Sequence, residues 1–433
     1  MNTVRANGWW LLLALTALNV LNFTDRYLIV AFSTRIVPEL GLTNLQFGLL
    51  TGIAFTLVYT LFGLVLGSLA DRVHRPRLIA AGLLVWSLVT VITGFTRSFL
   101  QMALARMCVG IGEAALTPAA ISMLADGFAP SRRALANGIY YLGIPIGIGG
   151  SYIFAGLFGS QLGWRGSFIA LGVVGVIAAV LVALFMRDRH REGARAVAGG
   201  SLRESWAAVA QELRRNRALR LILFGCIASS CVQGAAVLDL LWWVRERGFA
   251  EATAQRLNGL MFLLGGIFGA LLGGWGGDRM EARVVGGRLR FLVVAYAVGI
   301  PLMLVFRLLP ADSMLFLPFA FLGNAVFMLV FGPALATLQT IVPASMRAAT
   351  IALFVLVTSL IGSAGGSALV GGLADAFTAA GQSEPITLAI IATQSIGLLT
   401  VPLFLLAARC ITPAWKAAAA ADAAAEARAT LAR

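Results

Sequence analysis

Charged side chains are scarce in this 433-residue sequence, and lysine is almost absent. Only 12% of the residues are Asp, Glu, Lys or Arg, whereas a soluble domain has about 25%. Lys416 is the single lysine among 33 basic residues, a bias typical of GC-rich bacterial genomes. The low charge and a hydrophobic share of 59% exclude an ordinary soluble domain. They predict a multi-pass integral protein of a bacterial inner membrane.

Histidine and cysteine are also rare, which limits the chemistry available to the chain. His74 and His190 are expected in loops, and the four cysteines have neither pairing nor metal-ligand spacing. No G-x-x-x-x-G-K-[ST] loop is present to bind ATP. We therefore expect no enzymatic activity, no metal site and no cofactor besides protons as the coupling ion. A proton carried inside the membrane must then be held by a carboxylate.

The formal net charge of +14 reflects membrane topology rather than a nucleic-acid partner. If the N-terminus lies inside, 24 of the 33 basic residues fall in inner segments and seven in outer loops. Cytoplasmic loops of membrane proteins carry such an excess of Lys and Arg. Both termini are therefore predicted to be cytoplasmic. We expect a monomer surrounded by membrane lipids, with no bound nucleic acid.

Twelve apolar runs are long enough to cross a bilayer, since each crossing needs about 20 residues. The sequence thus predicts an all-α protein with twelve transmembrane helices. The expected spans are 9–32, 44–70, 77–96, 98–125, 134–158, 164–186, 218–243, 255–277, 288–309, 312–340, 346–373 and 385–409.

Two short patterns recur at nearly the same offset along the chain. Gly67–Arg72 is echoed by Gly274–Arg279, 207 residues later, and Pro130 begins a pattern echoed from Pro343, 213 residues later. Such repeats indicate two six-helix halves in parallel arrangement. We assign residues 1–190 and 218–410 to the halves, 191–217 to a cytoplasmic linker and 411–433 to a cytoplasmic tail.

The linker contains a pattern typical of an amphipathic helix. Ser201–Glu204 forms a capping box, and Trp206, Val209 and Leu213 then share one apolar face. We expect this helix to lie on the inner membrane surface. The alternative is a disordered tether.

The first apolar run carries a polar stripe. Asn19, Asn22 and the pair Asp25–Arg26 recur at helical spacing. A charge facing lipid at membrane depth costs roughly 2.5–3.5 kcal/mol, so the stripe must face a cavity or another helix. Arg106 and Glu113, two helical turns apart within 98–125, add two further intramembrane charges.

Three motifs resemble those of the major facilitator superfamily. Gly67–Arg77 resembles its signature loop G-x-L-A-D-R-x-G-R-[KR], with His74 in place of the second glycine. Arg106–Glu113 resembles its R-x-x-x-G-x-G motif, and Gly138–Gly150 its glycine-proline motif. The resemblance implies a fold of two six-helix halves and transport by alternating access. In that family the signature loop bonds across to the other half when the inner side is closed.

A narrower resemblance is to the Spinster family of lysolipid and sphingolipid transporters. It is carried by Leu18–Tyr27, by Leu42–Gly52 and by Arg106–Glu113. This resemblance implies a proton-linked carrier of amphiphilic lipids with a single acyl or sphingoid chain. The Asn-x-x-Asp-Arg element is shared with symporters of small organic anions in the same superfamily, so a proton- or cation-coupled anion symporter is the alternative.

We assign candidate roles within the membrane. Asp25 and Glu113 are candidates for proton binding, because an arginine that moves from a carboxylate to a phosphate favours protonation of that carboxylate. The alternative is a permanent charge network that only locks two helices together. The candidate substrate-binding residues are Arg26, Arg106, Asn22, Asn19 and Tyr27.

A second set of residues is expected to gate the inner side. The Asp71 carboxylate can meet the positive N-terminus of a facing helix, and Asp126 is a candidate partner for Arg72 or Arg75. The alternative is that these charges only set topology. The candidate gating residues are Asp71, Arg72, Arg75, Asp126, Asp278 and Arg279.

The intramembrane charges are distributed unevenly between the halves. Asp25, Arg26, Arg106 and Glu113 belong to the first half, whereas the second offers only amides, hydroxyls and Asp239. A cavity between the halves would have one charged and one mostly apolar wall. Such walls suit the head group and tail of an amphiphilic lipid. The adjacent Trp242–Trp243 pair is expected in an aromatic belt at the membrane surface.

Overall fold

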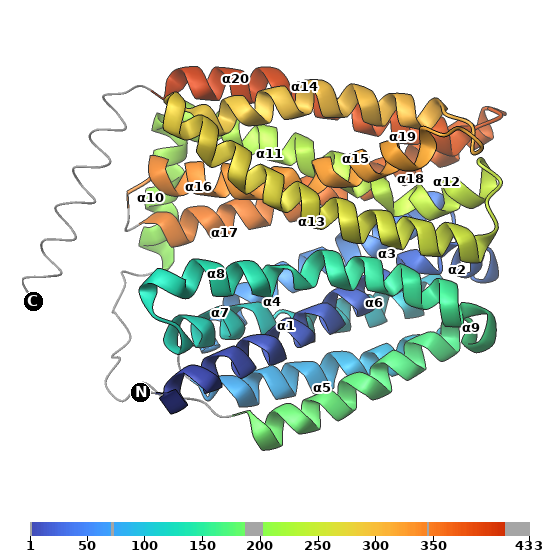
Figure 1. The fold of residues 1–433 in the computed structure, drawn as a ribbon. Helices are drawn as coiled ribbons and strands as arrows, with labels where there is room; N and C mark the ends of the chain where they lie inside the picture. The colour runs from blue at the N-terminus through green and yellow to red at the C-terminus, as the bar shows by residue number, and fades with distance from the viewer. Residues whose placement is uncertain (1, 71–72, 187–201, 344–345, 412–433) are drawn as a thin grey trace, which may run out of the picture. The chain divides into compact units, whose positions relative to one another are not determined.

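The computed structural model describes residues 2–70, 73–186, 202–343 and 346–411. Within these ranges the chain forms helices and short connections, without any strand (Figure 1). The predicted all-α class is therefore confirmed. Two compact units are present. Unit 1 comprises 1–197, 237–263 and 371–386, and unit 2 comprises 198–236, 264–370 and 387–433. The two halves, linker and tail assigned from the sequence repeat stay a prediction.

Unit 1 contains the first nine helices, one later helix in full and parts of others. Its helices are α1 (Asn2–Ala31), α2 (Ser33–Glu39), α3 (Asn44–Thr51), α4 (Ile53–Ala70), α5 (Arg75–Thr93), α6 (Phe99–Glu113), α7 (Leu116–Gly127), α8 (Pro130–Tyr141), α9 (Gly143–Phe185), most of η1 (Ala236–Leu238), α12 (Asp239–Arg245) and parts of α13 (Glu251–Arg283) and α18 (Gly365–Ala379).

Unit 2 is built around α11 and α14. Its helices are α10 (Leu202–Arg215), α11 (Arg217–Ala235), the remainder of α13, α14 (Gly287–Leu308), α15 (Phe316–Leu329), α16 (Phe331–Ile341), α17 (Arg347–Val357), the π-helical segment η3 (Thr358–Ala364), the start of α18, most of α19 (Pro385–Ser395), η4 (Ile396–Leu399) and α20 (Thr400–Cys410).

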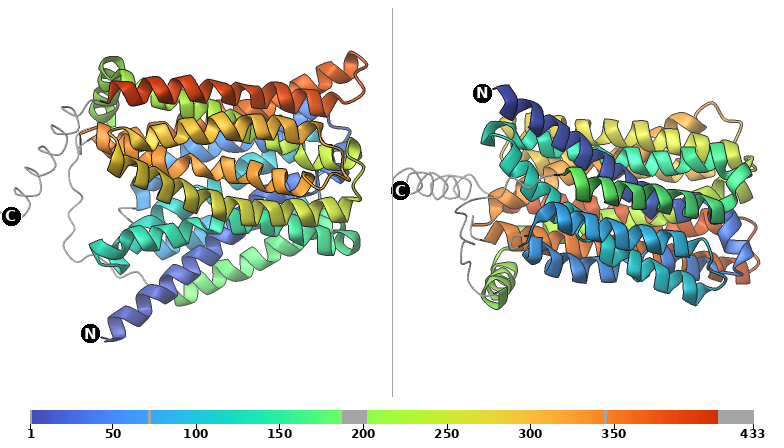
Figure 2. Two further views of the ribbon diagram at one scale, coloured as in Figure 1. Left: turned by 45° about the horizontal axis from the view of Figure 1, so that its top comes forward. Right: turned by 90° about the horizontal axis from the view of Figure 1, so that it is seen from below.

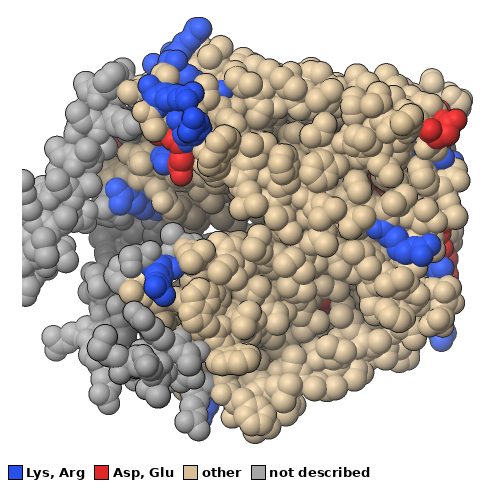
Figure 3. Space-filling model, in the orientation of Figure 1, with Lys and Arg blue, Asp and Glu red and all other residues tan. Residues whose placement is uncertain are grey.

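Ten stretches of the described chain are long and apolar enough to cross a membrane. One of them, Leu135–Phe185, is 51 residues long, too long for a single crossing of a core about 30 Å thick. It reverses direction at Gly163, where φ is +63° and ψ is 178°, a conformation that favours glycine. Two predicted spans therefore lie on either side of this turn: α8 and the first part of α9 form one, and the rest of α9 forms the other. On the face drawn in Figure 3, charged residues gather near the ends of the helices, as expected for a multi-pass protein.

Several predicted spans are interrupted helices. The second span consists of α3 and α4, separated at Gly52, and the fourth consists of α6 and α7, separated after Glu113. The helix starts follow the sequence: Thr43 and Gln46 form a capping box at α3, and the Ser98 side chain caps α6.

Close backbone contact brings the helices of unit 1 together. A Cβ atom at Gly82 of α5 would lie 2.6 Å from the Gly112 carbonyl oxygen of α6, and one at Gly147 of α9 would lie 2.6 Å from the Val20 oxygen of α1. Glycine at these positions permits the approach of neighbouring helices. α1 is thereby held against α9, and α5 against α6, around the polar stripe of α1.

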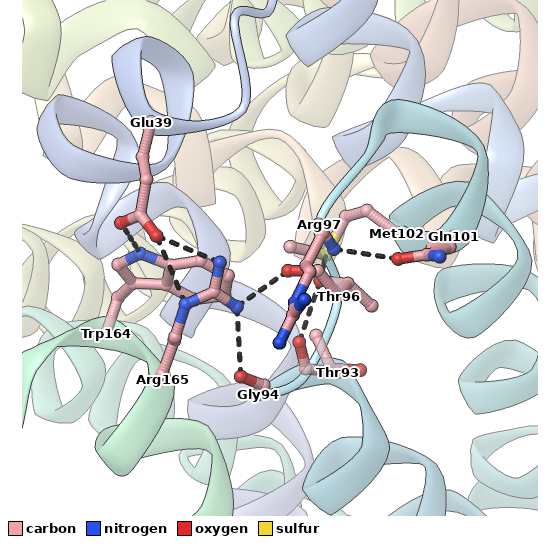
Figure 4. A network of polar contacts seen from close by, with 9 residues as sticks. All are labelled: Glu39, Thr93, Gly94, Thr96, Arg97, Gln101, Met102, Trp164 and Arg165. Atoms are coloured by element: carbon pink, nitrogen blue, oxygen red, sulfur yellow. Dashed lines mark hydrogen bonds and ion pairs between the residues drawn. The ribbon is translucent and has the colours of Figure 1, made fainter.

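The turn in α9 is fixed by a polar network (Figure 4). Trp164 Nε1 and the Arg165 guanidinium donate hydrogen bonds to the Glu39 carboxylate, and Arg165 also donates to the carbonyls of Gly94 and Thr96 after α5. The hydrogen bond from Trp164, reinforced by Arg165, holds the pKa of the Glu39 carboxyl below its ordinary value. The ends of α2, α5 and the two segments of α9 are thus joined.

In unit 2, α10 lies crosswise to the long helices α11 and α14 (Figures 1 and 2). The predicted linker helix is therefore present, from Leu202 to Arg215, with Val209 buried. The predicted capping residue Ser201 lies outside the described residues. The core of this unit includes a hydrogen bond between the Ser229 and Tyr296 hydroxyls and one from Gln233 to the Phe327 carbonyl.

Candidate functional site

The four intramembrane charges predicted from the sequence lie together in unit 1. We call Asp25, Arg26, Arg106 and Glu113 the charged cluster. Asp25 of α1 is 2% exposed, and it lies close enough to the other three to interact with them electrostatically. α1 carries the first two residues and α6 the other two, so the cluster joins two helices.

Arg26 is the pairing partner of Glu113. The Arg26 Nη2 and Nε atoms donate to Glu113 Oε2 at 2.7 and 3.1 Å, and the Glu113 side chain is completely buried. The same guanidinium lies over the rings of Phe23, Phe55 and Tyr59, with centroids 4.8, 4.4 and 4.7 Å away. A cation is therefore held among aromatic faces on one side and a carboxylate on the other.

The Asp25 carboxylate is held by a hydroxyl group. Thr90 of α5 donates from Oγ1 to Asp25 Oδ2 at 2.6 Å. Arg106 does not form a salt bridge with this carboxylate among the described contacts; its Nη2 donates to the main-chain carbonyl of Arg26 at 3.2 Å, and its guanidinium lies 5.1 Å from the Phe55 ring. The two carboxylates of the cluster therefore have different partners.

Several buried polar atoms at this site have no hydrogen-bond partner among the described residues. They are Asp25 Oδ1, Glu113 Oε1, Arg106 Nε and Asn22 Nδ2. Buried polar groups are nearly always hydrogen-bonded in folded proteins. Each carboxylate thus retains an oxygen that can take up a proton or accept a further bond, and Arg106 retains a donor for an anion.

The remaining candidate substrate residues differ in their surroundings. Asn19 is buried and donates from Nδ2 to the Tyr140 carbonyl of α8 at 2.8 Å. This contact favours a role in holding α1 against α8. Asn22 is 4% exposed and lies one turn before Arg26, whereas Tyr27 is half-buried. Their substrate contacts stay a prediction.

The candidate gating residues are only partly described. Asp71 and Arg72 lie outside the described residues. Arg75, the N1 residue of α5, donates to Asp126 Oδ2 at 2.6 Å and to Ser122 at 3.0 Å, so the expected pairing of Asp126 with this loop is present.

The second copy of the loop pattern makes contacts within unit 2. Asp278 accepts from Arg288 at 2.7 Å, and Arg279 lies over the Trp275 ring, 5.7 Å from its centroid. Asp278 therefore ties α13 to the start of α14. The gating role of both residues stays a prediction.

A second polar region of unit 1 was not predicted. The Asp375 carboxylate of α18 accepts from the main-chain N–H groups of Asn44 and Leu45, at 2.9 and 2.8 Å, and from the Asn44 amide at 2.9 Å. It thus adds a second cap to the N-terminus of α3, beside the local capping box of Thr43 and Gln46. These residues are more than 300 positions apart, so sequence spacing gives no signal for the pair.

An ion pair adds to this region. Arg35 of α2 and Glu251 of α13 are 3.0 Å apart, and Gln255 donates to the Ala31 carbonyl at 2.8 Å. The sequence signal for this ion pair is that Arg35 and Glu251 are charged residues next to apolar runs.

Two expectations about the later segments were wrong. Trp242 and Trp243 are 0% and 1% exposed, so they are core residues and not part of a lipid-facing aromatic belt. The second half was expected to offer only amides, hydroxyls and Asp239, but Arg307 is 2% exposed in the last turn of α14, where its Nε donates to Gln394 at 3.3 Å. The second half thus contains a buried cation, Arg307, in addition to the buried carboxyl group of Asp239. Among the described residues, no group of three His, Cys, Asp or Glu could hold a metal ion.

Comparison with known proteins places the fold and the site in context. Residues 15–367 match the Major Facilitator Superfamily. An MFS-type efflux pump of Mycolicibacterium smegmatis is 28% identical over 394 residues, which cover 90% of this chain and 91% of that protein. The sphingosine-1-phosphate transporter SPNS2 of Mus musculus is 29% identical over 248 residues, 55% of this chain and 44% of its own length.

A solved structure shows the same fold. It is a bacterial homologue of the human lysosomal transporter Spinster, in an inward-facing and unoccupied conformation, with a TM-score of 0.81 and 24% identity. The match covers 93% of this chain and 97% of that one. The predicted resemblance to Spinster-type proteins is therefore confirmed. The chain belongs to the Major Facilitator Superfamily and is a multi-pass membrane transporter, not an enzyme.

Proposed function

We propose that this protein is a proton-coupled secondary transporter of an amphiphilic lipid with an anionic head group, of the lysophospholipid or sphingolipid type, and works by alternating access. The charged cluster supports this proposal most directly. Two carboxylates and the Arg106 guanidinium are buried in an apolar bundle, the Arg26 side chain beside them is 19% exposed, and each carboxylate has one oxygen without a partner among the described residues.

Coupling follows from the competition for Arg26. Arg26 forms an ion pair with Glu113 and neutralises its charge. A phosphate or other anionic head group that attracts Arg26 removes the counter-charge from a buried carboxylate, which is then stabilised by taking up a proton. Among the described contacts, the Asp25 carboxylate accepts a hydrogen bond only from the Thr90 hydroxyl. Asp25 is therefore the second candidate proton carrier. Anion and proton binding then favour each other.

The surroundings of Arg26 suit an amphiphile. Phe23, Phe55 and Tyr59 place aromatic surface directly beside the cation, so an anionic head and an adjoining chain can be bound side by side. The relative named as a sphingosine-1-phosphate transporter supports a lipid substrate.

The second candidate is a proton- or cation-coupled symporter of small organic anions. The specific observation in its favour is that two arginines, the buried Arg106 and the partly exposed Arg26, lie within one cluster. Two guanidinium groups can bind a carboxylate or phosphate by several charge-assisted hydrogen bonds without any contact to a lipid chain.

The test is transport of a labelled lysophospholipid in proteoliposomes, with and without an imposed pH gradient. Wild type is compared with Asp25→Asn and with Asp312→Asn, a control that removes an exposed carboxylate far from the cluster in sequence. We expect gradient-driven lipid movement in wild type and the control, and its loss in Asp25→Asn. Full pH-driven transport by both Asp25→Asn and Glu113→Gln contradicts the coupling role. No lipid movement, together with uptake of a small organic phosphate, selects the anion symporter.

A further inference from the structure

The hydroxyl of Thr90 has two acceptors but only one proton. Its Oγ1 atom lies 2.6 Å from Asp25 Oδ2 and 2.9 Å from the Trp86 carbonyl oxygen. Thr90 is 1% exposed and Asp25 2% exposed, so water has little access to this contact. A hydroxyl group can donate one hydrogen bond and accept others. Its proton can therefore point either to the neighbouring helix or back along its own helix.

We propose that Thr90 is a positioning residue that adapts to the protonation state of Asp25. This inference rests on the proposed role of Asp25 in proton coupling. When Asp25 is ionised, the Thr90 O–H donates to its carboxylate. When Asp25 holds a proton taken from solvent, its O–H donates to Thr90 Oγ1, and Thr90 turns its own proton to the Trp86 carbonyl.

This exchange keeps a buried group satisfied in both states. An acceptor-only partner would leave the carboxylate unsatisfied when ionised, and a donor-only partner would oppose the protonated acid. An unsatisfied polar group that is buried destabilises the folded state. A hydroxyl next to a backbone carbonyl avoids this cost in either state, so Asp25 can gain and lose a proton without any movement of α1 relative to α5.

The neighbouring threonine shows what Thr90 would do without the carboxylate. Thr93, three positions later on α5, donates only to the Val89 carbonyl of its own helix, at 2.8 Å, among the described contacts. Such bonds to the preceding turn are common for threonine in helices. Thr90 makes the same bond to Trp86 and adds the contact to Asp25. Thr93 is therefore a matched control.

The charges around Asp25 define what else affects its proton. Glu113 and Arg106 on α6 and Arg26 on the same helix face this carboxylate, and Thr90 is the facing group on α5. Substitution of Thr90 leaves all three charges in place. A changed titration of Asp25 in a Thr90 variant therefore reports the hydroxyl and not a lost charge.

The experiment is an infrared titration of purified protein, in which the band of protonated carboxyl groups that is absent in Asp25→Asn is assigned to Asp25. Thr90→Val keeps the side-chain shape without the hydroxyl, Thr90→Ala is a second variant without it, and Thr90→Ser restores it. Under the exchange, removal of the hydroxyl costs the ionised acid a hydrogen bond to a charged group, about 1.5–3 kcal/mol, and the protonated acid a neutral hydrogen bond, about 0.5–1.5 kcal/mol. The difference should move the midpoint of this band to higher pH by about one unit, with recovery in Thr90→Ser and no change in Thr93→Val.

The outcomes separate this inference from the proposed function. An Asp25 band with the same midpoint in wild type, Thr90→Val and Thr90→Ala overturns the role of Thr90, whatever transport shows. A shifted midpoint accompanied by unchanged pH-driven transport in Asp25→Asn supports the hydrogen-bond exchange and overturns the coupling function. Shifts in both the infrared titration and the pH profile of transport support both.

Discussion

The ion pair between Arg26 and Glu113 offers a sharp test of how the charged cluster is stabilised. The Glu113 side chain is fully buried, 2.7 Å from the guanidinium. Removal of Arg26 alone leaves a buried carboxylate without its counter-charge, which costs about 3–5 kcal/mol. The contacts with three rings are worth about 0.5–2 kcal/mol more. Arg26→Met is therefore expected to lower the free energy of unfolding by about 4–6 kcal/mol.

The double variant Arg26→Met/Glu113→Gln removes both charges. It loses the pair but leaves neither charge buried alone, so we expect a loss of only about 1–3 kcal/mol. Glu113→Gln alone should cost about 2–3 kcal/mol, because Arg26 keeps its aromatic contacts. The two single effects, together about 6–9 kcal/mol, then exceed the double effect by about 3–8 kcal/mol.

Unfolding in mixed micelles, followed by tryptophan fluorescence, measures these free energies. The interaction energy should shrink as the pH falls, because the carboxylate left alone in Arg26→Met can be neutralised by a proton. The half-exposed pair of Arg165 and Glu39 is the control, with an expected interaction of about 0–1 kcal/mol. Single effects that add to the double effect within about 0.5 kcal/mol refute a stabilising charge pair in the cluster.

Three further predictions concern packing, capping and pH. Gly82→Ala should lower the free energy of unfolding by about 1–3 kcal/mol, whereas Gly63→Ala, whose new Cβ meets nothing within 4 Å, should be neutral or stabilising by up to about 1 kcal/mol; equal effects in thermal unfolding contradict the close contact. Asp375→Ala should speed amide hydrogen exchange in the first turn of α3, because its cap contributes about 0.5–2 kcal/mol; unchanged exchange there rules out the capping role. Since the pKa of Glu39 is lower in the folded state, its carboxylate stabilises the fold above its ordinary pKa, and this contribution is lost as the pH falls through the lowered value. An acid titration of Trp164 fluorescence should show the loss, and Glu39→Gln should abolish the change.

The all-helical, membrane-spanning fold could be predicted because the sequence features that indicate it are local. Apolar runs of sufficient length and the cost of charge in lipid follow from neighbouring residues alone. For the same reason Asp25, Arg26, Arg106 and Glu113 were identifiable as a group, since each interrupts an apolar helix. The turn at Gly163 lies between the predicted spans 134–158 and 164–186. The break at Gly52, inside the predicted span 44–70, was not predicted, because glycines are frequent in all spans and only the backbone conformation distinguishes this one.

The partners within the site could not be predicted. The pairing of Arg26 with Glu113 rather than with the adjacent Asp25 depends on the angle between α1 and α6. Thr90 gave no signal, because threonine in a helix usually bonds to its own backbone. Trp242 was misplaced for a related reason: a tryptophan near the end of an apolar run suits both a membrane surface and a core, and only packing decides between them.

The even charge balance of the cluster determines how the transport cycle responds to voltage. With all four groups ionised, the two guanidinium groups and two carboxylates sum to zero. A cluster that holds one proton and one singly charged head group also sums to zero. A membrane potential does about 2.3 kcal/mol of work per elementary charge per 100 mV, so neither state is driven by it. Under the proposed cycle, a monoanionic lipid is therefore moved electroneutrally by the proton gradient alone, whereas a dianionic one carried with a single proton makes transport generate a current.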